Sequence, residues 1–511
     1  MRDHEPITIE EFNGWWRRGD KEAAPMDHAV DLNNVQFFES GVRTRDGIEV
    51  MQIGDEVGAT YPDVVRMYTF VHNGVQGLLV LDSLGNIYHS RSPTPFVAIL
   101  TIPEMTDFAF VGIAGRAYIS PHDGVMGLED EFLYVYLGNG SPARKAGGAA
   151  PVGAAMTVTP NGVGNIEAGV HIWGVVYETD TGFLTQLGPT TFTDQTFDGN
   201  NAADISGIPI SPSSDVVARR IVVTKAINPV DYLGDLDAYQ FFFVPNGRIP
   251  NNSATTLNGV NFFDVELLED ASHLLDLFAE IPAGVFLTTY HERLVIGGFF
   301  ADLTSTDQAI IALPSTAYVS FKGEPEAIDQ VDGIIVTPLE GNPLTNGQEF
   351  RDVLYLFKKT RTYAYNDNGD TPVTWLLAVI DQGIGCSVHG IASVLDSGGV
   401  NIEYLIVIDF SGVMLFNGTY IRPELSWKIA DYWLGLDRDT FNQFQVANDS
   451  LNQRIYITQG NTTILYAEYA DNLDPKSIKW APWTFTVPEI TSLTLINTDT
   501  LVIGASLAAI P

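Results

Sequence analysis

The residues of this chain that could do chemistry begin with His291-Glu292, which opens like the H-E-x-x-H motif of zinc proteases. In that motif two histidines one helical turn apart hold a zinc ion, and the glutamate acts as a general base. Here the second histidine is missing, because position 295 is Val295. No other pair among the nine histidines has the spacing of metal ligands, so we expect no metal site and no cofactor.

Other catalytic patterns are missing as well. The sequence has no G-x-S-x-G turn, no G-x-x-x-x-G-K-[ST] loop, no G-x-G-x-x-G after a strand and no sialidase-type S-x-D-x-G-x-T-W box. The acidic turn Asn366–Asp370 does not fit the EF-hand spacing, and we interpret it as a hydrogen-bonded turn. Asp82 and Asp409 are interpreted as structural turn residues. We therefore predict that the protein is not an enzyme and has no catalytic residue.

Charge is the most informative bulk property. The sequence has 63 acidic and 27 basic residues, which gives a net charge of −36. Binding to duplex DNA requires clustered Lys and Arg, so this composition disfavours nucleic-acid binding and would repel DNA. The alternative is that the charge only keeps a large β protein soluble. The basic pairs are scattered, and we expect them to face acidic patches on neighbouring subunits or to be solvated: Arg43/Arg45, Arg144-Lys145, Arg219-Arg220 and Lys358-Lys359/Arg361.

The single cysteine, Cys386, excludes an internal disulfide, and we predict that it packs as a small buried hydrophobic residue. The first residues lack the apolar core of a signal peptide, so we expect no export by that route. No run of 18 apolar residues offers a membrane span.

A repeated hairpin is the main structural unit that the sequence predicts. In Tyr404–Thr419 an apolar run, a turn from Asp409 to Gly412 and a second apolar run predict two antiparallel strands. Leu78–Ser90 repeats this spacing, with Asp82 and Gly85 in the turn. Looser copies follow 40–50 residues apart, which is typical of a β-propeller. Hairpins of this kind cannot bury both faces alone and must stack on one another.

The middle of the chain has a different composition. The stretch 138–153 is rich in Gly, Ala, Ser and Pro and is interpreted as a linker at a domain boundary. The apolar runs after it, among them Gly169–Leu184 and Arg219–Lys225, suit a small β-sandwich. Leu267–Glu280 has apolar residues at helical spacing and predicts a short amphipathic helix. The last strands, Ile490–Ile496 and Thr500–Ala505, are expected to complete the sheet that begins near 35–51.

Three stretches carry a resemblance to a known class of protein. They are the entry Asp31–Phe38 with Gly41–Ile48, the strand Tyr290–Gly298, and the succession of runs from Val353 through Cys386 to Gly418. Together they resemble the β-propeller proteins that form the nozzle or hub of short-tailed bacteriophage tails. The strand end from Tyr177 to Gly182 similarly resembles a fibronectin type III strand.

The resemblance implies an all-β fold: a β-propeller of about six or seven blades with an inserted immunoglobulin/fibronectin-like β-sandwich. On this basis we divide the chain into an N-terminal arm (1–30), the first blades (31–150), the inserted sandwich with its return linker (151–280), and the remaining blades with ring closure (281–511).

By the same resemblance, the protein would be a structural part of the virion, made in the host cytoplasm. It would form a homo-oligomeric ring, commonly a hexamer, between adjacent tail or adaptor proteins. Phage DNA would pass through the ring without specific binding, because an acidic wall offers no cations to hold phosphates.

Trp15, Trp16, Arg17 and Arg18 place two aromatic side chains beside two cations, a combination that anchors interfaces. We expect them either to contact a neighbouring subunit or to fold back on their own domain. Two other functions stay open. An adhesin for host-surface polysaccharide would show an exposed Trp and Tyr cluster, and a glycan hydrolase would need two carboxylates facing each other in a central pocket.

Overall fold

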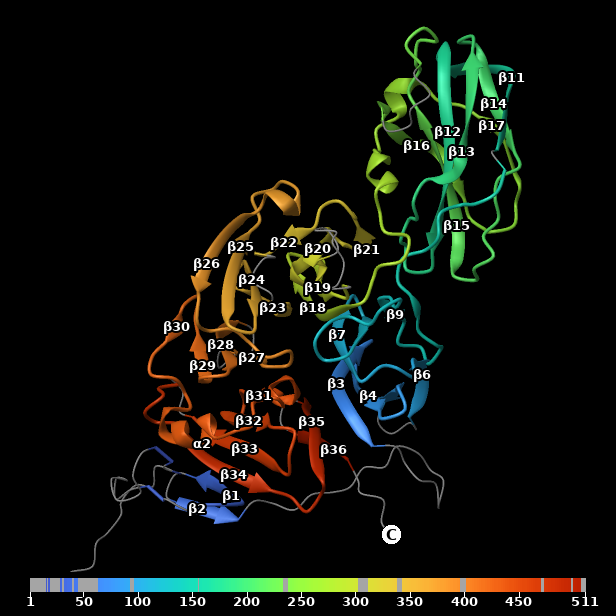
Figure 1. Cartoon of the computed structure of the whole chain (residues 1–511). Helices are drawn as coiled ribbons and strands as arrows, with labels where there is room; N and C mark the ends of the chain where they lie inside the picture. The colour runs from blue at the N-terminus through green and yellow to red at the C-terminus, as the bar shows by residue number, and fades with distance from the viewer. Residues whose placement is uncertain are drawn as a thin grey trace, which may run out of the picture. The chain divides into compact units, whose positions relative to one another are not determined.

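The computed structural model of the chain contains two compact units (Figure 1). It describes residues 15, 17–18, 28–29, 32–38, 41–44, 63–91, 96–154, 156–232, 238–301, 311–337, 342–395, 401–469, 473–497 and 500–506. The first unit combines Met1–Arg144, Pro282–Ala317 and Ile334–Pro511, and the second combines Lys145–Ile281 with Tyr318–Gly333. The division after Arg144 falls inside the stretch 138–153.

The first unit is a β-propeller built from consecutive antiparallel sheets, which we call blades 1 to 6, and a terminal hairpin. Blade 1 is β3 (Val64–His72), β4 (Val75–Asp82), β5 (Asn86–Arg91) and β6 (Val97–Thr101). Blade 2 is β7 (Asp107–Ile113), β8 (Arg116–His122), β9 (Tyr134–Tyr136) and β10 (Arg144–Lys145). Blade 3 is β18 (Gly284–Tyr290), β19 (Arg293–Phe299), β20 (Thr316–Phe321) and β21 (Glu324–Ile328), with β22 (Ile334–Ile335) also paired to β20. Its outer part, from Tyr318 through β21, is grouped with the second compact unit.

The later blades follow in chain order. Blade 4 is β23 (Leu344–Phe350), β24 (Val353–Lys358), β25 (Arg361–Asn366) and β26 (Leu376–Asp381). Blade 5 is β27 (Ile391–Leu395), β28 (Ile402–Asp409), β29 (Gly412–Phe416) and β30 (Tyr420–Ile421). Blade 6 is β31 (Val446–Asp449), β32 (Arg454–Thr458), β33 (Thr463–Glu468) and β34 (Lys479–Thr484). The terminal hairpin is β35 (Glu489–Ile496) with β36 (Thr500–Ser506).

Alternation along the strands explains why the apolar runs are continuous. In β28, Leu405 and Val407 pack into a cluster shared with blade 4, whereas Ile406 and Ile408 pack into one shared with blade 6. Successive side chains of a strand point to opposite faces, so a blade between two neighbours needs apolar residues at every position. Each of these fully buried side chains contributes roughly 1.5–3 kcal/mol relative to an exposed one.

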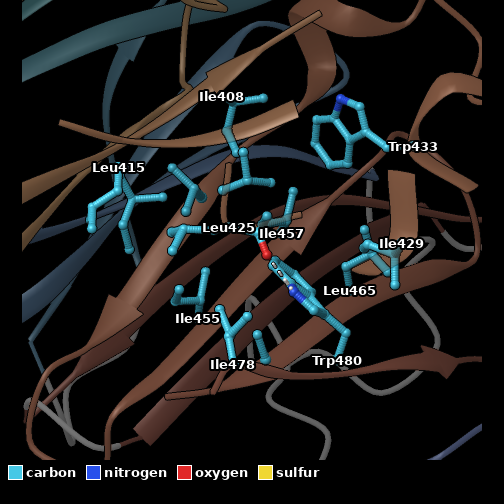
Figure 2. Close-up of a cluster of buried hydrophobic side chains, with 14 of the residues drawn as sticks. Ile408, Leu415, Leu425, Ile429, Trp433, Ile455, Ile457, Leu465, Ile478 and Trp480 are labelled. Carbon is cyan, nitrogen blue, oxygen red and sulfur yellow. Dashed lines mark hydrogen bonds between the residues drawn. The ribbon is translucent and has the colours of Figure 1, made fainter. Parts of the chain in front are cut away.

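The core between blades 5 and 6 shows this packing directly (Figure 2). Ile408 and Leu415 of blade 5 face Ile455 and Leu465 of blade 6 across a layer without water-exposed groups. The indole N–H of Trp480 donates a 2.9 Å hydrogen bond to the carbonyl oxygen of Leu425, which satisfies the polar atom of this large buried ring. Short helical segments near this core are η8 (Trp427–Ile429), α2 (Ala430–Leu434) and η9 (Phe441–Gln443).

The predicted turn residues have structural roles. Asp82 is fully buried and accepts hydrogen bonds from the backbone N–H groups of Leu84 and Asn86, both at 2.9 Å. Asp409 holds the equivalent turn of blade 5 and accepts from the N–H of Gly385 at 2.9 Å. Both interpretations are confirmed, and so is the burial of Cys386, whose thiol pKa is raised well above its usual value by burial.

The ends of the ring meet differently from the expectation. Among the described residues, β1 (Val35–Phe38) pairs with β2 (Gly41–Thr44), and β35 pairs with β36, with no ladder joining the two hairpins. Instead, Phe37 shares a hydrophobic cluster with Ile490 and Leu493. The predicted single sheet is therefore wrong for these residues, while 45–62 lie outside the described part of the chain.

Closure between the first and last blades uses side chains. The N–H of Met67 donates to Ser492 Oγ at 2.9 Å, and the hydroxyls of Thr69 and Thr494 lie 3.0 Å apart. Thr69 Oγ1 also donates to the carbonyl oxygen of Leu495 at 2.6 Å. The terminal hairpin thus occupies the place between blade 6 and blade 1, and its contact with β3 completes the ring.

The second unit is a β-sandwich of two sheets. One has the order β11 (Thr157–Ile166), β14 (Asn201–Ser206), β17 (Thr256–Val260), and the other β13 (Gly188–Phe197), β12 (Gly169–Thr179), β15 (Val216–Thr224), β16 (Phe241–Ile249). The order β16-β15-β12-β13 matches the G-F-C-C′ strands of immunoglobulin-like sandwiches, and β11-β14 matches B-E. Trp173, Ile205 and Ile221 share the core between the sheets. The predicted all-β fold class, a propeller with an inserted sandwich, is confirmed.

The segment Leu267–Glu280 does not form the predicted helix. It contains only the short turn η4 (Ser272–Leu275), preceded by η3 (Asp264–Glu266). Its backbone pairs with β16, since the N–H of Phe243 donates to Glu269 O at 2.9 Å and that of Ala271 to Phe241 O at 2.8 Å. Leu274 is buried as the pattern required, so the apolar face was identified correctly and the helical backbone was not. No helix in the described part of the chain meets the length and hydropathy that a membrane-crossing helix requires.

Candidate functional site

The centre of the propeller holds a cavity of about 270 Å³. Residues of the innermost strands line it, including Tyr68, Phe286, Gln348, His389 and Gln445. None of the described side chains lining it is a carboxylate. The centre is therefore apolar and neutral-polar, in contrast to the acidic chain as a whole.

A buried ion pair lies beside this cavity. Arg66 of β3 donates from Nε to Asp107 Oδ1 at 2.9 Å and from Nη2 to Oδ2 at 2.8 Å. The same guanidinium donates from Nη1 to Gln445 Oε1 at 3.1 Å, and Ser492 Oγ donates to that oxygen at 2.7 Å. One arginine thus connects blade 1, blade 2, blade 6 and the terminal hairpin.

His389 extends the network to blade 5. Its Nε2 lies 2.8 Å from Asp107 Oδ2, and its Nδ1 lies 2.9 Å from the hydroxyl of Tyr68. Burial and the Arg66 charge together lower the pKa of His389, although Asp107 opposes them. Burial alone would raise the pKa of Asp107, but Arg66 and the nearby histidines hold it well below its usual range. The carboxylate is consequently ionised at neutral pH.

A metal ion is the first ligand to test here, because Asp107, His122 and His389 offer ligand atoms within 4.8 Å of one another. The hydrogen bonding of His122 argues against it. The backbone N–H of Gly124 donates to His122 Nδ1 at 2.9 Å, so the proton of the neutral ring must be on Nε2. Nε2 is then a donor without a lone pair for a metal, and no hydrogen-bond partner accepts from it. The Arg66 charge on Asp107 further disfavours a cation at this position.

Acid-base catalysis is equally unsuited to this centre. A glycan hydrolase needs one carboxylate that can be protonated near neutral pH and a second one opposite it. Asp107 contacts His389 of the cavity lining, and its ion pair with Arg66 keeps it deprotonated. The Arg66–Asp107 pair joins blades 1 and 2.

The predicted interface stretch lies against the chain's own propeller. Trp15 is 6% exposed, donates its backbone N–H to Trp480 O at 3.1 Å and packs edge-on against Tyr432. Arg17 lies over the Trp15 ring and Arg18 over Trp427. Trp16 is outside the described residues. Trp15 is thus a core residue of its own subunit, and among the described residues of the stretch Arg18 is exposed and Arg17 partly exposed.

The basic pairs find partners within the chain. Lys358 is buried in the propeller and donates to Ser315 Oγ and Thr337 O, both at 3.0 Å. In the sandwich, Arg219 is buried and donates to three backbone carbonyls, those of Pro209, Asn251 and Ala254. The expectation that these two cations face neighbours is wrong, since neither reaches the surface.

A second hollow, of about 330 Å³, lies on the sandwich beside Arg220 and Arg248. Arg248 makes two hydrogen bonds to Glu178, at 2.8 and 2.7 Å, and these lower the pKa of that carboxyl. Arg220 pairs with Glu269 at 3.0 Å. Both cations in the hollow are thus neutralised by carboxylates of the same unit.

Sequence reasoning did not find the central network. Arg66 and Asp107 are 41 residues apart in the sequence, and Asp107 and His389 are 282 residues apart. No local spacing therefore connects them. The available signal was an isolated arginine within an apolar strand, VVRMYTF, because a charge in such a run must have a buried partner.

Comparisons with known proteins add only a distant structural likeness. No family model and no curated protein matches the sequence. Hsv2 of Kluyveromyces lactis is 11% identical with a TM-score of 0.30, covering 83% of this chain and 98% of that one. A Bacteroides fragilis protein named for a suggested 6-phosphogluconolactonase activity is 10% identical with a TM-score of 0.29, covering 65% and 87%. Likeness at this level carries no information on function, so what defines the chain is its own architecture: a β-propeller closed by a terminal hairpin, with a β-sandwich inserted after blade 2.

Proposed function

We propose that the chain is a non-enzymatic structural subunit of a bacteriophage tail, of the nozzle or hub type, that forms a ring around a DNA-exit channel. The resemblance of Asp31–Phe38 and Tyr290–Gly298 to such proteins supplies the class. The distribution of charge is the observation that carries the mechanism.

Among the described residues, little of the net charge is buried. The charged residues buried there are four cations, Arg66, Arg219, Lys358 and Lys428, and five carboxylates, Asp82, Asp107, Glu326, Asp409 and Asp449, which together contribute a net −1. The charged residues that the structure describes outside this core are predominantly acidic. A surface of this kind has few cations to bind phosphates, and DNA would slide past it rather than adhere.

The build of the propeller agrees with a load-carrying role. Its blades are joined by continuous apolar layers and by the buried Arg66–Asp107–His389 network, whereas its central cavity has no carboxylate among the described lining residues. These features favour a rigid scaffold over the glycan hydrolase alternative. The adhesin alternative is also less supported, because the exposed large hydrophobic side chains in the described residues are Val, Leu, Ile and Phe, without Trp or Tyr.

The contact between subunits remains a prediction. Because Trp15 is buried in its own subunit, a neighbour could reach this stretch only through its exposed part, which includes Arg18. The acidic partner that such a contact requires would come from the other copy or from an adaptor protein.

Light scattering of the purified full chain tests the proposal. Six copies of the 55.8 kDa chain would give about 335 kDa, and gold-labelled antibody should mark the tail of intact particles. Fluorescence anisotropy with a duplex should show no binding at about 50 mM salt, where phosphate contacts are strongest. A stable monomer that is absent from particles, or tight DNA binding, would contradict the proposal.

A further inference from the structure

The structure assigns a second candidate centre to the turns of blades 3 and 4: we propose that His291, Glu349 and Asp352 bind one divalent transition-metal ion of the Zn²⁺ class. His291 lies in the β18–β19 turn, Glu349 near the end of β23, and Asp352 in the β23–β24 turn. Their ligand atoms all lie within 4.8 Å of one another. The proposal is independent of any role in a phage tail.

The distances leave a space between the ligands that no hydrogen bond fills. His291 Nε2 lies 3.9 Å from Glu349 Oε1 and 3.9 Å from Asp352 Oδ1, which is too long for hydrogen bonds. Two ligands of a tetrahedral zinc ion at about 2.1 Å would be roughly 3.4 Å apart. Asp352 is 92% exposed, so its side chain can move the half ångström that separates these values.

The orientation of the imidazole suits coordination. Nδ1 of His291 faces Asp367 Oδ2 at 4.0 Å, on the opposite side of the ring from Glu349 and Asp352. With the proton on Nδ1, facing Asp367, the lone pair of Nε2 would be directed at the other two carboxylates, as metal coordination requires. His122 in the central network has the reverse arrangement, with its Nδ1 accepting a backbone N–H.

The supporting residues hold the ring and both acidic loops in place. The Tyr290 ring stacks on His291 with centroids 4.2 Å apart. The Tyr290 hydroxyl donates to Asp352 O at 3.3 Å and accepts the N–H of Asp367 at 3.1 Å. One fully buried tyrosine therefore fixes the histidine and the two loops that carry carboxylates, which is the kind of support metal ligands require.

The two turns are also unusual for hairpins of this propeller. The corresponding turns of blades 1 and 2 place glycine second, with Asn73-Gly74 at φ 50° and 74° and Ala114-Gly115 at 51° and 75°. In blade 3, His291 and Glu292 have φ values of 46° and 63°, and in blade 4 Arg351 and Asp352 have 50° and 61°. Asp and His are among the non-glycine residues that left-handed backbone tolerates best, so these turns can present both side chains without glycine.

The charge balance points to a cation. Glu349, Asp352 and Asp367 place three carboxylates around one imidazole, and the guanidinium of Arg293 lies 3.9 Å from Asp367. A ligand set of one imidazole and two carboxylates prefers Zn²⁺ and similar ions to Ca²⁺ or Mg²⁺, which take oxygen ligands. The isolated His291-Glu292 pair in the sequence thus obtains its other ligands from the next blade instead of from a second histidine.

Equilibrium dialysis of the full chain with ZnCl₂ tests the site, with 1 mM Ca²⁺ and Mg²⁺ present to occupy surface carboxylates. We expect one Zn²⁺ per chain, and at least tenfold weaker binding in each of the variants Glu349→Gln, Asp352→Asn and His291→Gln. Co²⁺ should give the visible absorption of a low-symmetry, partly nitrogen-ligated ion, and lose it in the same variants.

Two matched controls separate this site from general binding. Glu129→Gln/Asp130→Asn removes two carboxylates from an exposed loop, and His72→Gln removes the histidine next to the equivalent turn of blade 1. Both should bind Zn²⁺ like the unmodified chain. Unmodified binding in the three site variants, or the absence of stoichiometric Zn²⁺ binding by the unmodified chain, would overturn the proposal, and tryptophan fluorescence checks that each variant is folded.

Discussion

Replacing Asp107 by asparagine should destabilise the propeller by about 3–5 kcal/mol, the usual cost of leaving a buried charge without its partner. Arg66 Nη2 and Asp107 Oδ2 are 2.8 Å apart, which corresponds to an attraction of about 6 kcal/mol at an effective dielectric constant of 20. Asparagine keeps the size and one acceptor oxygen but no charge. The guanidinium would retain Gln445 as a neutral partner, so the loss of stability should be smaller than the attraction of about 6 kcal/mol.

Urea unfolding followed by tryptophan fluorescence measures this effect selectively. Of the described tryptophans, six lie in the propeller unit and only Trp173 lies in the sandwich, so the signal reports mainly on the propeller. The double variant Arg66→Met/Asp107→Leu removes both charges. Its loss of stability should be at least 2 kcal/mol smaller than the summed losses of the single variants Arg66→Met and Asp107→Leu. A loss below about 1 kcal/mol for Asp107→Asn, or additive costs in the cycle, would refute the assignment of this pair as the joint between blades.

Three further predictions follow from buried groups. Trp15→Ala should lower the free energy of unfolding by about 3–5 kcal/mol in the same urea titration, as other truncations of large core residues do. The mass measured by light scattering should not change. A changed copy number with unaltered stability would instead identify a subunit contact. Asp82→Ala should cost about 2 kcal/mol because it removes the buried carboxylate that accepts from the N–H groups of Leu84 and Asn86, whereas Asp123→Ala on an exposed turn should cost less than about 1 kcal/mol. Burial lowers the pKa of His122 to about 4, so between about pH 6.5 and pH 4 only the unfolded state takes up this proton. The free energy of unfolding should therefore fall by about 3 kcal/mol as the pH drops through this range. His122→Gln should flatten this pH dependence in urea titrations at stepped pH, and an unchanged slope would contradict the assignment.

The fold could be predicted because blades are local in sequence. The repeat of Asp82 and Gly85 in Asp409 and Gly412 reports a turn whose partners lie within a few residues, as the hydrogen bonds of Asp82 show. The segment Leu267–Glu280 was misjudged because its apolar spacing fits a helix equally well as a chain laid along a sheet. Pairing with β16 decided between them, and that pairing is set by tertiary structure.

The sites could not be predicted for a related reason. Asp107 and His389 come together only when blades 2 and 5 face the same centre, and His291 meets Glu349 only across the border between two blades. In a propeller, the arrangement of the blades around the central axis brings such residues together, so they have no characteristic spacing in the sequence. The sequence offered two signals: a lone arginine in an apolar strand and a histidine without the second histidine of its motif.

The seam between the terminal hairpin and β3 sets the order of folding. Within a blade, partners are joined by short connections, but Thr69 and Leu495 are separated by 426 positions. Closing so long a loop costs entropy before any contact forms, so local hairpins should assemble first and the ring should close last. Because this seam joins the two ends of the ring and is the last to form, it should also open first, and amide hydrogens of β35 and β36 should exchange before those of β28 in the native protein. A ring built in this way can be opened at one place without dismantling any blade.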